Sequence, residues 1–159
     1  MELKIVAEDK YLPQYANETD ACMDLKACLK GVPDAMYVND GIQYIAQTEI
    51  QPGEIKKVGT GVQVAIPEGY VMKIYVRSST GIKKNLVLAN GTGIIDAGYR
   101  DEIIMALHNI GREPVIIKDG DRLCQFILLP YPKVELVRCE DNEDFRTGDR
   151  GGGIGSTGN

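Results

Sequence analysis

Apolar and polar residues alternate with a period of two along much of the chain, which limits the folds that it can adopt. The run GVQVAIP places Val62, Val64 and Ile66 on one face of an extended segment, and YVMKIYV at residues 70–76 alternates in the same way. Turn residues separate such runs about every 8 to 12 positions, as is typical of an all-β sandwich or barrel. Further strand-like runs are EIIMALHNI, PVIIK, RLCQFILLP and KVELVRC. We therefore predict an all-β fold.

Length, charge and cysteine content restrict the class of protein. The 159 residues suffice for one domain. The net charge of −5 argues against broad nucleic-acid binding, although local cations could still hold a polyphosphate. No apolar run approaches the roughly 20 residues that span a bilayer, and MELKIVAEDK lacks the pattern of a secretory signal. The four cysteines form no C-x-x-C pair and are interpreted as reduced thiols. We expect a cytoplasmic protein with no membrane and no nucleic-acid partner.

Three segments depart from the alternation. STGIKKNL is predicted to form a single helical turn, and residues 31–50 a hairpin or a long loop. Residues 145–159 are rich in glycine and nearly free of apolar side chains, so they cannot bury enough surface to order themselves. We therefore divide the chain into a β-barrel domain, residues 1–144, and a flexible C-terminal arm, residues 145–159. The arm is either a frayed terminus or a segment that closes over an anion.

Polar residues inside or directly after apolar runs are the candidates for chemistry. Arg77, Ser78 and Ser79 follow a strand and could hold phosphate oxygens, although a solvated polar turn has the same composition. Gln125 lies inside an apolar strand, where its amide needs either a ligand or the backbone as a partner. Asp96 follows two isoleucines in GTGIIDAGYRDE, where burial without a partner would be unfavourable.

Five stretches, taken in order, resemble the five motifs of the homotrimeric dUTP pyrophosphatase (dUTPase) family. They are DACMDLKA, RSSTGIKKNL, NGTGIIDAGYRDEI, GDRLCQF and DRGGGIGSTG, and the match runs from about residue 20 to the C-terminus. One short motif is weak evidence, whereas five with sensible spacing are specific. The resemblance implies a distorted jelly-roll-like β-barrel, a homotrimer, and active sites that each draw residues from three chains. It implies hydrolysis of dUTP to dUMP and pyrophosphate, which keeps uracil out of DNA and supplies dUMP for thymidylate synthesis.

The resemblance assigns the third motif to recognition of the base. The motif would form a β-hairpin whose main chain pairs with the polar edge of uracil. A site that satisfies uracil leaves buried groups unpaired with cytosine, and can discriminate by roughly 10⁴. The residues implied are Asn90, Gly93, Ile94 and Ile95.

The same motif supplies the implied sugar contact and the implied catalytic group. Tyr99 resembles the aromatic residue that packs on deoxyribose and refuses a 2′-hydroxyl. Asp96 resembles the carboxylate that orients and deprotonates the attacking water. We expect Asp96 to be partly desolvated, because burial makes a carboxylate a better base.

The resemblance also implies how the triphosphate and a metal are held. Gln125 would bind a phosphate oxygen, and the other phosphate contacts would come from Arg77, Ser78, Ser79 and Gly81. Mg²⁺ is the implied cofactor, chelated by the three phosphates and met by Asp24 through water. The metal would support in-line attack at the α-phosphorus, with pyrophosphate leaving.

The fifth motif departs from the family pattern R-G-x-G-G-F-G, in which the phenylalanine stacks over uracil. Ile154 stands at that position, one residue closer to Arg150 than the pattern requires. We hypothesise that Phe145 supplies the stacking lid from upstream; alternatively, it pins the arm to a neighbouring subunit. At the γ-phosphate we expect Arg150 rather than Arg146. The arm residues expected to contact substrate are Phe145, Arg150, Ile154, Gly155 and Ser156.

Two other functions fit parts of the same pattern. A dCTP deaminase shares the implied fold but needs a glutamate ten residues beyond Asp96, where this chain has Ala106. A methyl group cannot shuttle protons, so the deaminase is disfavoured. A non-catalytic nucleotide sensor or regulatory protein could keep the pocket, but it would not need Asp96, Arg77 and Gln125 together.

Overall fold

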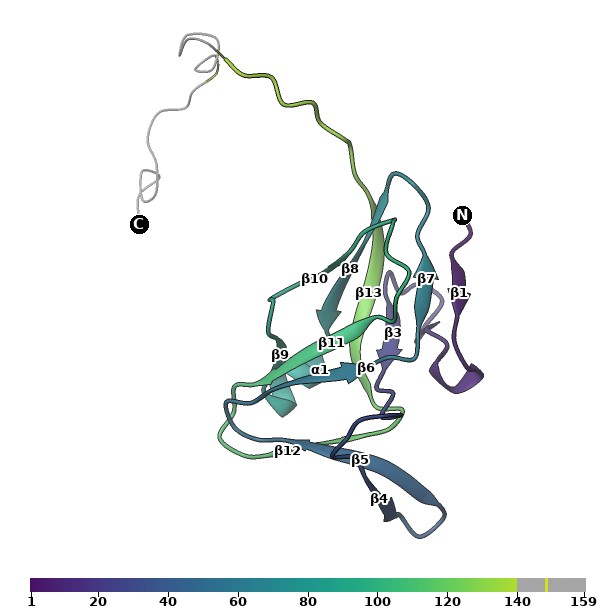
Figure 1. The fold of residues 1–159 in the computed structure, drawn as a ribbon, viewed down its shortest axis with the longest axis vertical. Coiled ribbons are helices and arrows are strands. Elements are labelled where there is room, and N and C mark those ends of the chain that lie inside the picture. Colours follow the sequence, from purple (N-terminus) through teal and green to yellow (C-terminus); the bar gives the residue numbers. More distant parts are fainter. Residues whose placement is uncertain (140–147, 149–159) are drawn as a thin grey trace.

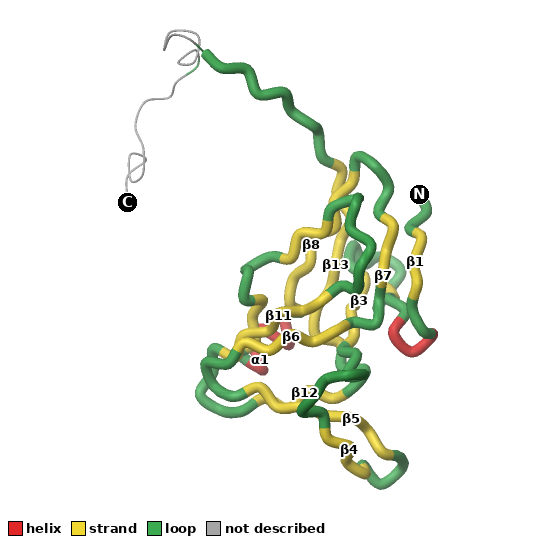
Figure 2. The backbone as a smooth tube through the Cα atoms, viewed as in Figure 1, coloured by secondary structure: helices red, strands yellow, loops and turns green. Residues whose placement is uncertain are grey.

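The computed structural model describes residues 1–139 and 148, and within them nearly all regular structure is β. The strands are β1 (Lys4–Val6), β2 (Gln14–Tyr15), β3 (Met23–Lys26), β4 (Met36–Asn39), β5 (Tyr44–Ile50), β6 (Ile55–Gly59), β7 (Gln63–Ala65), β8 (Tyr70–Val76), β9 (Leu86–Leu88), β10 (Gly93–Ile95), β11 (Ile104–Asn109), β12 (Val115–Lys118) and β13 (Arg122–Pro130). Helical structure in this part of the chain is limited to α1 (Ser78–Lys84) and the 3-10 turn η1 (Asp9–Tyr11), red in Figure 2. Neither could span a bilayer.

The strands form four antiparallel sheets, and β13 lies at the centre of the largest. That sheet has the order β10-β8-β13-β3-β2, so β13 pairs with β8 on one side and β3 on the other. The smaller sheets have the orders β6-β11-β9, β12-β5-β4 and β1-β7. Figure 1 shows β6 and β11 crossing the direction of β8 and β13. One cluster of buried side chains joins the sheets. The predicted all-β architecture is confirmed.

The period-two alternation decides which side chains enter this core. Val62, Val64 and Ile66 are buried, as are Met72 and Ile74 of β8. Each such side chain contributes about 1.5–3 kcal/mol when it leaves water. The alternation therefore fixes both the inner face of the barrel and much of the driving force for folding.

Helix α1 follows strand β8 directly. Arg77 still has extended backbone, and the chain becomes helical at Ser78. Thr80 is the buried residue of the helix. The helix ends where Asn85 adopts a left-handed conformation (φ 53°) and its N–H donates to the Thr80 carbonyl. The predicted helical turn over STGIKKNL is confirmed and begins at the residues proposed to hold phosphate.

Residues 31–50 contain the hairpin β4–β5, one of the two alternatives predicted for this segment. Met36 pairs with Gln47, and Asn39 with Tyr44. At the turn, the Asp40 carboxylate accepts hydrogen bonds from the amides of Ile42 and Gln43, each at 2.9 Å. These side chain to backbone bonds close the hairpin.

The predicted strand KVELVRC is not a strand in this structure. Residues 131–139 follow β13 and are all exposed, with Val134, Leu136 and Val137 exposed by 75%, 93% and 80%. Figure 1 shows this segment running away from the body of the molecule. The alternation is real, but no strand among the described residues lies beside it to complete a ladder.

Strand β13 contains a bulge that changes the face on which one charged residue lies. Gln125 lies opposite Asp24 and Cys124 opposite Leu25, but Arg122 then lies opposite Lys26. The extra residue is Leu123, which is buried, like Cys124. Without the bulge Arg122 would point to the inner face, because side chains alternate along a strand. The bulge returns it to the outer face, beside Asp24.

Candidate active site

A carboxylate held between two guanidinium groups lies on the outer face of the large sheet. Asp24 is 6% exposed. Its Oδ1 forms an ion pair with Nε of Arg77 at 2.8 Å, and its Oδ2 accepts a hydrogen bond from Nη1 of Arg122 at 3.0 Å. The three residues come from β3, the end of β8 and the start of β13. A buried carboxylate needs such partners, and in return it fixes the orientation of both guanidinium groups.

A cavity of about 270 Å³ opens beside this carboxylate. Gln125 is the direct cross-strand neighbour of Asp24, so their side chains lie on the same face. Arg77 and Cys22 also line the cavity. Burial, together with the nearby Asp20 and Asp24, raises the pKa of the Cys22 thiol. The lining residues are Ala16, Asp20, Ala21, Cys22, Asp24, Arg77 and Gln125. The structure thus brings together Asp24, Arg77 and Gln125, as predicted from three separate motifs.

The remaining residues of the second motif lie at the start of α1. Ser78 and Ser79 are exposed and directly follow Arg77. The Gly81 amide already donates to the Arg77 carbonyl at 2.9 Å, as the first turn of a helix requires. The amides before Gly81 precede the first bond of the helix and are the donors that a phosphate could use.

The third motif lies elsewhere on the sheet and differs from the predicted hairpin. Gly93, Ile94 and Ile95 form strand β10, which pairs with β8 rather than with a neighbouring part of the motif. Asn90 is exposed in the turn before it. The hairpin prediction was wrong, because the partner of β10 comes from a distant segment.

Asp96 follows β10 and is exposed in the single chain. The expectation of a partly desolvated Asp96 is therefore not met within one chain. Tyr99 is half-buried, and its hydroxyl donates to the Glu102 carbonyl at 2.7 Å. The hydroxyl is thereby occupied, and the ring remains the part of Tyr99 that could meet a ligand.

Within one chain, the predicted phosphate site around Asp24 is well separated from the predicted base, Asp96. Asp24 and Gln125 lie level with Tyr75 of β8, whereas Asp96 follows Ile95, which lies opposite Met72. At about 4.8 Å between strands and about 3.3 Å per residue, Asp96 and Asp24 are roughly 14 Å apart across the sheet and roughly 13 Å along it. One chain does not place the proposed base beside its own phosphate cavity.

The carboxylates at the cavity limit how a metal could be bound. No group of three histidine, cysteine or acidic side chains could hold a metal among residues 1–139 and 148. Asp20 accepts hydrogen bonds from the main chain and the side chain of Asn17, and each oxygen of Asp24 is paired with an arginine. These acceptors fit a hydrated Mg²⁺ carried by phosphate oxygens, and do not fit a metal bound directly by protein ligands.

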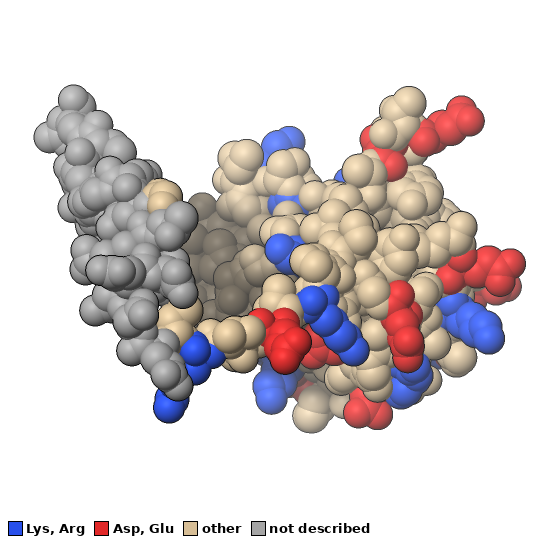
Figure 3. All heavy atoms as spheres, turned by 90° about the horizontal axis from the view of Figure 1, so that it is seen from above, with Lys and Arg blue, Asp and Glu red and all other residues tan. Residues whose placement is uncertain are grey.

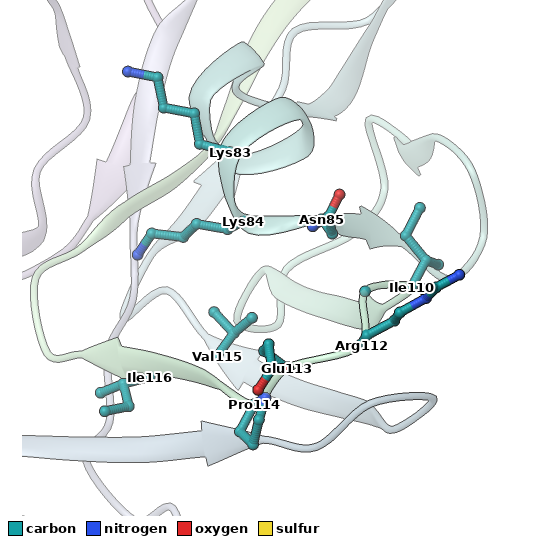
Figure 4. Close-up of a pocket in the computed structure, with 10 residues that line it drawn as sticks. Lys83, Lys84, Asn85, Ile110, Arg112, Glu113, Pro114, Val115 and Ile116 are labelled. Carbon is teal, nitrogen blue, oxygen red and sulfur yellow. The ribbon is translucent and has the colours of Figure 1, made fainter.

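A larger cavity lies away from the predicted site residues. It has a volume of about 730 Å³ and lies between the end of α1 and strand β12. Figure 4 shows Lys84 and Asn85 on one side of it, and Arg112, Val115 and Ile116 on the other. On the face shown in Figure 3, basic and acidic side chains are interspersed. The larger cavity also has an amide and a carboxylate in its lining, Asn85 and Glu113, but none of the residues singled out by the five motifs as substrate contacts.

Sequence reasoning overlooked Arg122, the second partner of Asp24. Its only signal was a charged residue at the start of an apolar strand, and a bulge is not visible in that pattern. The predicted contacts of the fifth motif, at Phe145, Arg150, Ile154, Gly155 and Ser156, lie outside the described residues, as does the alternative Arg146.

Comparison with known proteins agrees with the resemblance of the five motifs. A sequence model of the dUTPase family matches residues 41–158, most of the chain. The chain belongs to the dUTPase family. Among curated proteins, the deoxyuridine 5′-triphosphate nucleotidohydrolase of Desulfitobacterium hafniense is 37% identical over 161 residues, covering 99% of this chain and 95% of that protein.

Solved dUTPase structures share the fold. The crystal structure of the dUTPase from Streptococcus mutans aligns with a TM-score of 0.67 at 25% identity, covering 85% of this chain and 99% of that one. A dUTPase of phage phi11 of S. aureus, described with a structural Mg(II) ion, aligns with a TM-score of 0.72 at 23% identity, covering 90% of this chain and 99% of that one. The predicted jelly-roll-like β-barrel is confirmed.

Proposed function

We propose that the protein hydrolyses dUTP to dUMP and pyrophosphate, with Asp96 activating the water that attacks the α-phosphorus. The observation that carries the proposal is the cavity where Asp24, Arg77 and Gln125 meet, in a chain that belongs to the dUTPase family. The nucleotidohydrolase name of the D. hafniense relative supports the same substrate. In the cell, this reaction would keep uracil out of DNA and supply dUMP for thymidylate synthesis.

The triphosphate would lie at the cavity and the start of α1. Arg77 is oriented by Asp24 and offers its remaining guanidinium N–H groups to phosphate oxygens. Ser78, Ser79 and the first amides of α1 would add neutral donors, and Gln125 would donate from the adjacent strand. Bound Mg²⁺ would neutralise phosphate charge and fix the chain for in-line displacement. Asp24 and Asp20 would contact its water ligands.

The nucleoside would lie against the third motif. Main-chain groups of Gly93, Ile94 and Ile95, together with Asn90, would pair with uracil. The ring of Tyr99 would pack on deoxyribose, since its hydroxyl is bonded to the Glu102 carbonyl. Asp96 would then stand beside the α-phosphate, and enclosure by substrate and a neighbouring chain would supply the desolvation that one chain lacks.

We infer that the active protein is a homotrimer with shared sites. Two observations support this: Asp96 lies far from the phosphate cavity of its own chain, and residues 131–139 expose alternating apolar side chains that no strand among the described residues covers. Exposed apolar segments of this kind mark interfaces between proteins. The arm, residues 145–159, would close over the site of another copy.

The direct test is pyrophosphate release from a panel of dUTP, dTTP, dCTP and UTP, with and without Mg²⁺. We expect rapid release from dUTP alone, dependent on the metal. Ammonia release from dCTP would instead indicate the deaminase, and tight dUTP binding without turnover would indicate a nucleotide sensor. A molar mass of three chains in light scattering would support the trimer, and a monomer that turns over dUTP would refute shared sites.

A further inference from the structure

The segment that carries Asp96 is braced by hydrogen bonds within itself. We refer to residues 96–102 as the Asp96 turn. The Tyr99 amide donates to the Asp96 carbonyl at 3.0 Å, and the Tyr99 hydroxyl donates to the Glu102 carbonyl at 2.7 Å. Arg100 donates to the carbonyls of Ala97 and Tyr99. The position of the Tyr99 ring therefore depends on where Glu102 is held.

Glu102 is in turn fixed to a different part of the fold. Its Oε1 accepts from the Gly61 amide at 2.7 Å, in the turn between β6 and β7. Gly61 has φ +66°, a left-handed conformation that aims its N–H and suits glycine. The carboxylate thus joins the Asp96 turn to a segment about 40 residues earlier in the sequence.

The position of the Glu102 carboxylate also explains why residue 59 is a glycine. A Cβ atom at Gly59 would lie 2.5 Å from Oε1 of Glu102, which is shorter than any stable contact. Gly59 lies at the end of β6, where the main chain passes directly beside the carboxylate. Glycine at this position leaves the space that the carboxylate occupies.

Hydrogen bonds other than those of Glu102 also join the barrel at this point. The Ile103 amide donates to the Val62 carbonyl at 2.9 Å, and the Thr60 hydroxyl donates to the Ile103 carbonyl at 2.8 Å. Ile103 and Thr60 are fully buried. These bonds hold the start of β11 against the β6–β7 turn, so loss of the carboxylate would release the Asp96 turn and leave the core joined.

We propose that Glu102 is a positioning residue that fixes Tyr99 and Asp96 and thereby sets discrimination between deoxyribose and ribose. The proposal rests on the proposed dUTP hydrolysis, in which the Tyr99 ring meets the sugar. A Tyr99 ring held in a fixed position leaves no space for a 2′-hydroxyl group on the sugar, whereas a ring that is free to move admits one. A displaced Asp96 also lowers turnover, because a shift of about 1 Å at a reacting group can change rates by roughly 10²-fold.

The test compares Glu102→Ala with Glu102→Gln for kcat and KM on dUTP and UTP. The alanine variant should lower kcat for dUTP by roughly tenfold or more and narrow the dUTP:UTP ratio of kcat/KM by roughly tenfold. The glutamine variant retains an oxygen that accepts from Gly61 and should restore most of the ratio. Glu113→Ala, exposed and remote from the turn, is the matched control and should leave the ratio unchanged.

Two outcomes would overturn the inference. One is an unchanged dUTP:UTP ratio in a folded Glu102→Ala variant, whatever happens to kcat. If that variant does not fold, Gly59→Ala decides, because its methyl group displaces the carboxylate without removing it; an unchanged ratio there would contradict the proposal. Failure of the wild-type protein to cleave dUTP would instead refute the proposed function, so the two failures are distinguishable.

Discussion

Arg122 donates to Asp24 at 3.0 Å because a bulge at Leu123 turns it to the outer face of the sheet. Both Leu123 and Cys124 are buried, so two consecutive side chains enter the core. The side chain of Arg122, which precedes them, therefore points outward. Asp24 therefore has a guanidinium on each oxygen. Arg77, which we expect to touch phosphate, is held by a carboxylate whose own position depends on Arg122.

Arg122→Met should weaken substrate binding more than it weakens the fold. The Arg122 side chain is 50% exposed, and Arg77 would still pair with the buried Asp24 in the variant, so no buried charge is left unpaired. The loss of Arg122 leaves Asp24 free to turn with Arg77, so we expect KM for dUTP to rise roughly tenfold with little change in Tm. Arg112→Met, an exposed residue beside the other cavity, is the control. An unchanged KM would show that Arg77 is oriented without Arg122.

Much of the fold follows from local pattern. The alternation over residues 62–76 predicted the buried face of β7 and β8, and the stretch STGIKKNL predicted the helical turn of α1. Asp24, Arg77 and Gln125 were assigned to one site from motif resemblance, and their strands are neighbours in one sheet. Such features depend on residues close in sequence, or on a family pattern that already encodes the pairing.

The features that were mispredicted depend on distant partners. KVELVRC alternates like a strand, but a strand also needs a neighbour, and none of the described residues supplies one. The third motif looked like a hairpin, yet its strand β10 pairs with β8. Arg122 reaches Asp24 only through a bulge, which depends on the packing of Leu123 and Cys124 rather than on any local signal.

The cysteines should differ strongly in reactivity. All four are free thiols, and burial raises the pKa of Cys124 to about 12, so the Cys124 thiol stays protonated at pH 8. Cys139 is exposed. With iodoacetamide at pH 8, mass spectrometry should find Cys139 alkylated and Cys124 intact until the protein is unfolded in urea. Equal labelling of the two in the native protein would show that β13 opens readily.

Asp119→Asn should destabilise the protein in a pH-dependent way. Burial opposes ionisation, but hydrogen bonds from the Leu29 amide, Lys10 and Tyr11 outweigh it and lower the pKa of Asp119. A folded pKa below the unfolded value of about 3.9 stabilises the fold above that pH, and this contribution is lost as pH falls through the folded pKa. We expect a loss of about 2 kcal/mol at pH 7.

Urea unfolding from pH 7 down to pH 3 checks this prediction. The difference between wild type and Asp119→Asn should narrow below about pH 4. Asp9→Asn, at an exposed acid in the neighbouring turn η1, should show no comparable loss. A difference that stays constant across the range would mean that packing rather than charge holds Asp119.

Two alanine variants in the arm can identify which residue packs over uracil. Ile154 stands where the family pattern has phenylalanine, and Phe145 is the aromatic residue nearest upstream. Stacking of a base on an aromatic ring contributes about 1–3 kcal/mol. Phe145→Ala should therefore raise KM for dUTP by roughly tenfold or more, with a smaller effect of Ile154→Ala. An unaffected Phe145→Ala would exclude it as the lid.

Asp96→Asn should lower turnover by roughly 10² to 10⁴, the usual contribution of a positioned base, while substrate binding persists. The amide keeps the size of the carboxylate but cannot accept the proton of water. Single-turnover kinetics with dUTP, beside equilibrium binding of a non-hydrolysable analogue, separates the two effects. Near-normal turnover would contradict the assignment of Asp96 as the base.

The distance between Asp96 and its own phosphate cavity leads to a stronger test, in which two inactive variants restore each other. In a mixed trimer of Asp96→Asn and Arg77→Ala chains, a site is intact when one chain supplies Arg77 and a neighbour supplies Asp96. Random assembly of equal amounts makes about a quarter of the sites intact. Co-expressed variants should therefore recover about a quarter of wild-type activity, while each alone stays near background. Activity no greater than the mean of the two parents would mean that each chain completes its own site.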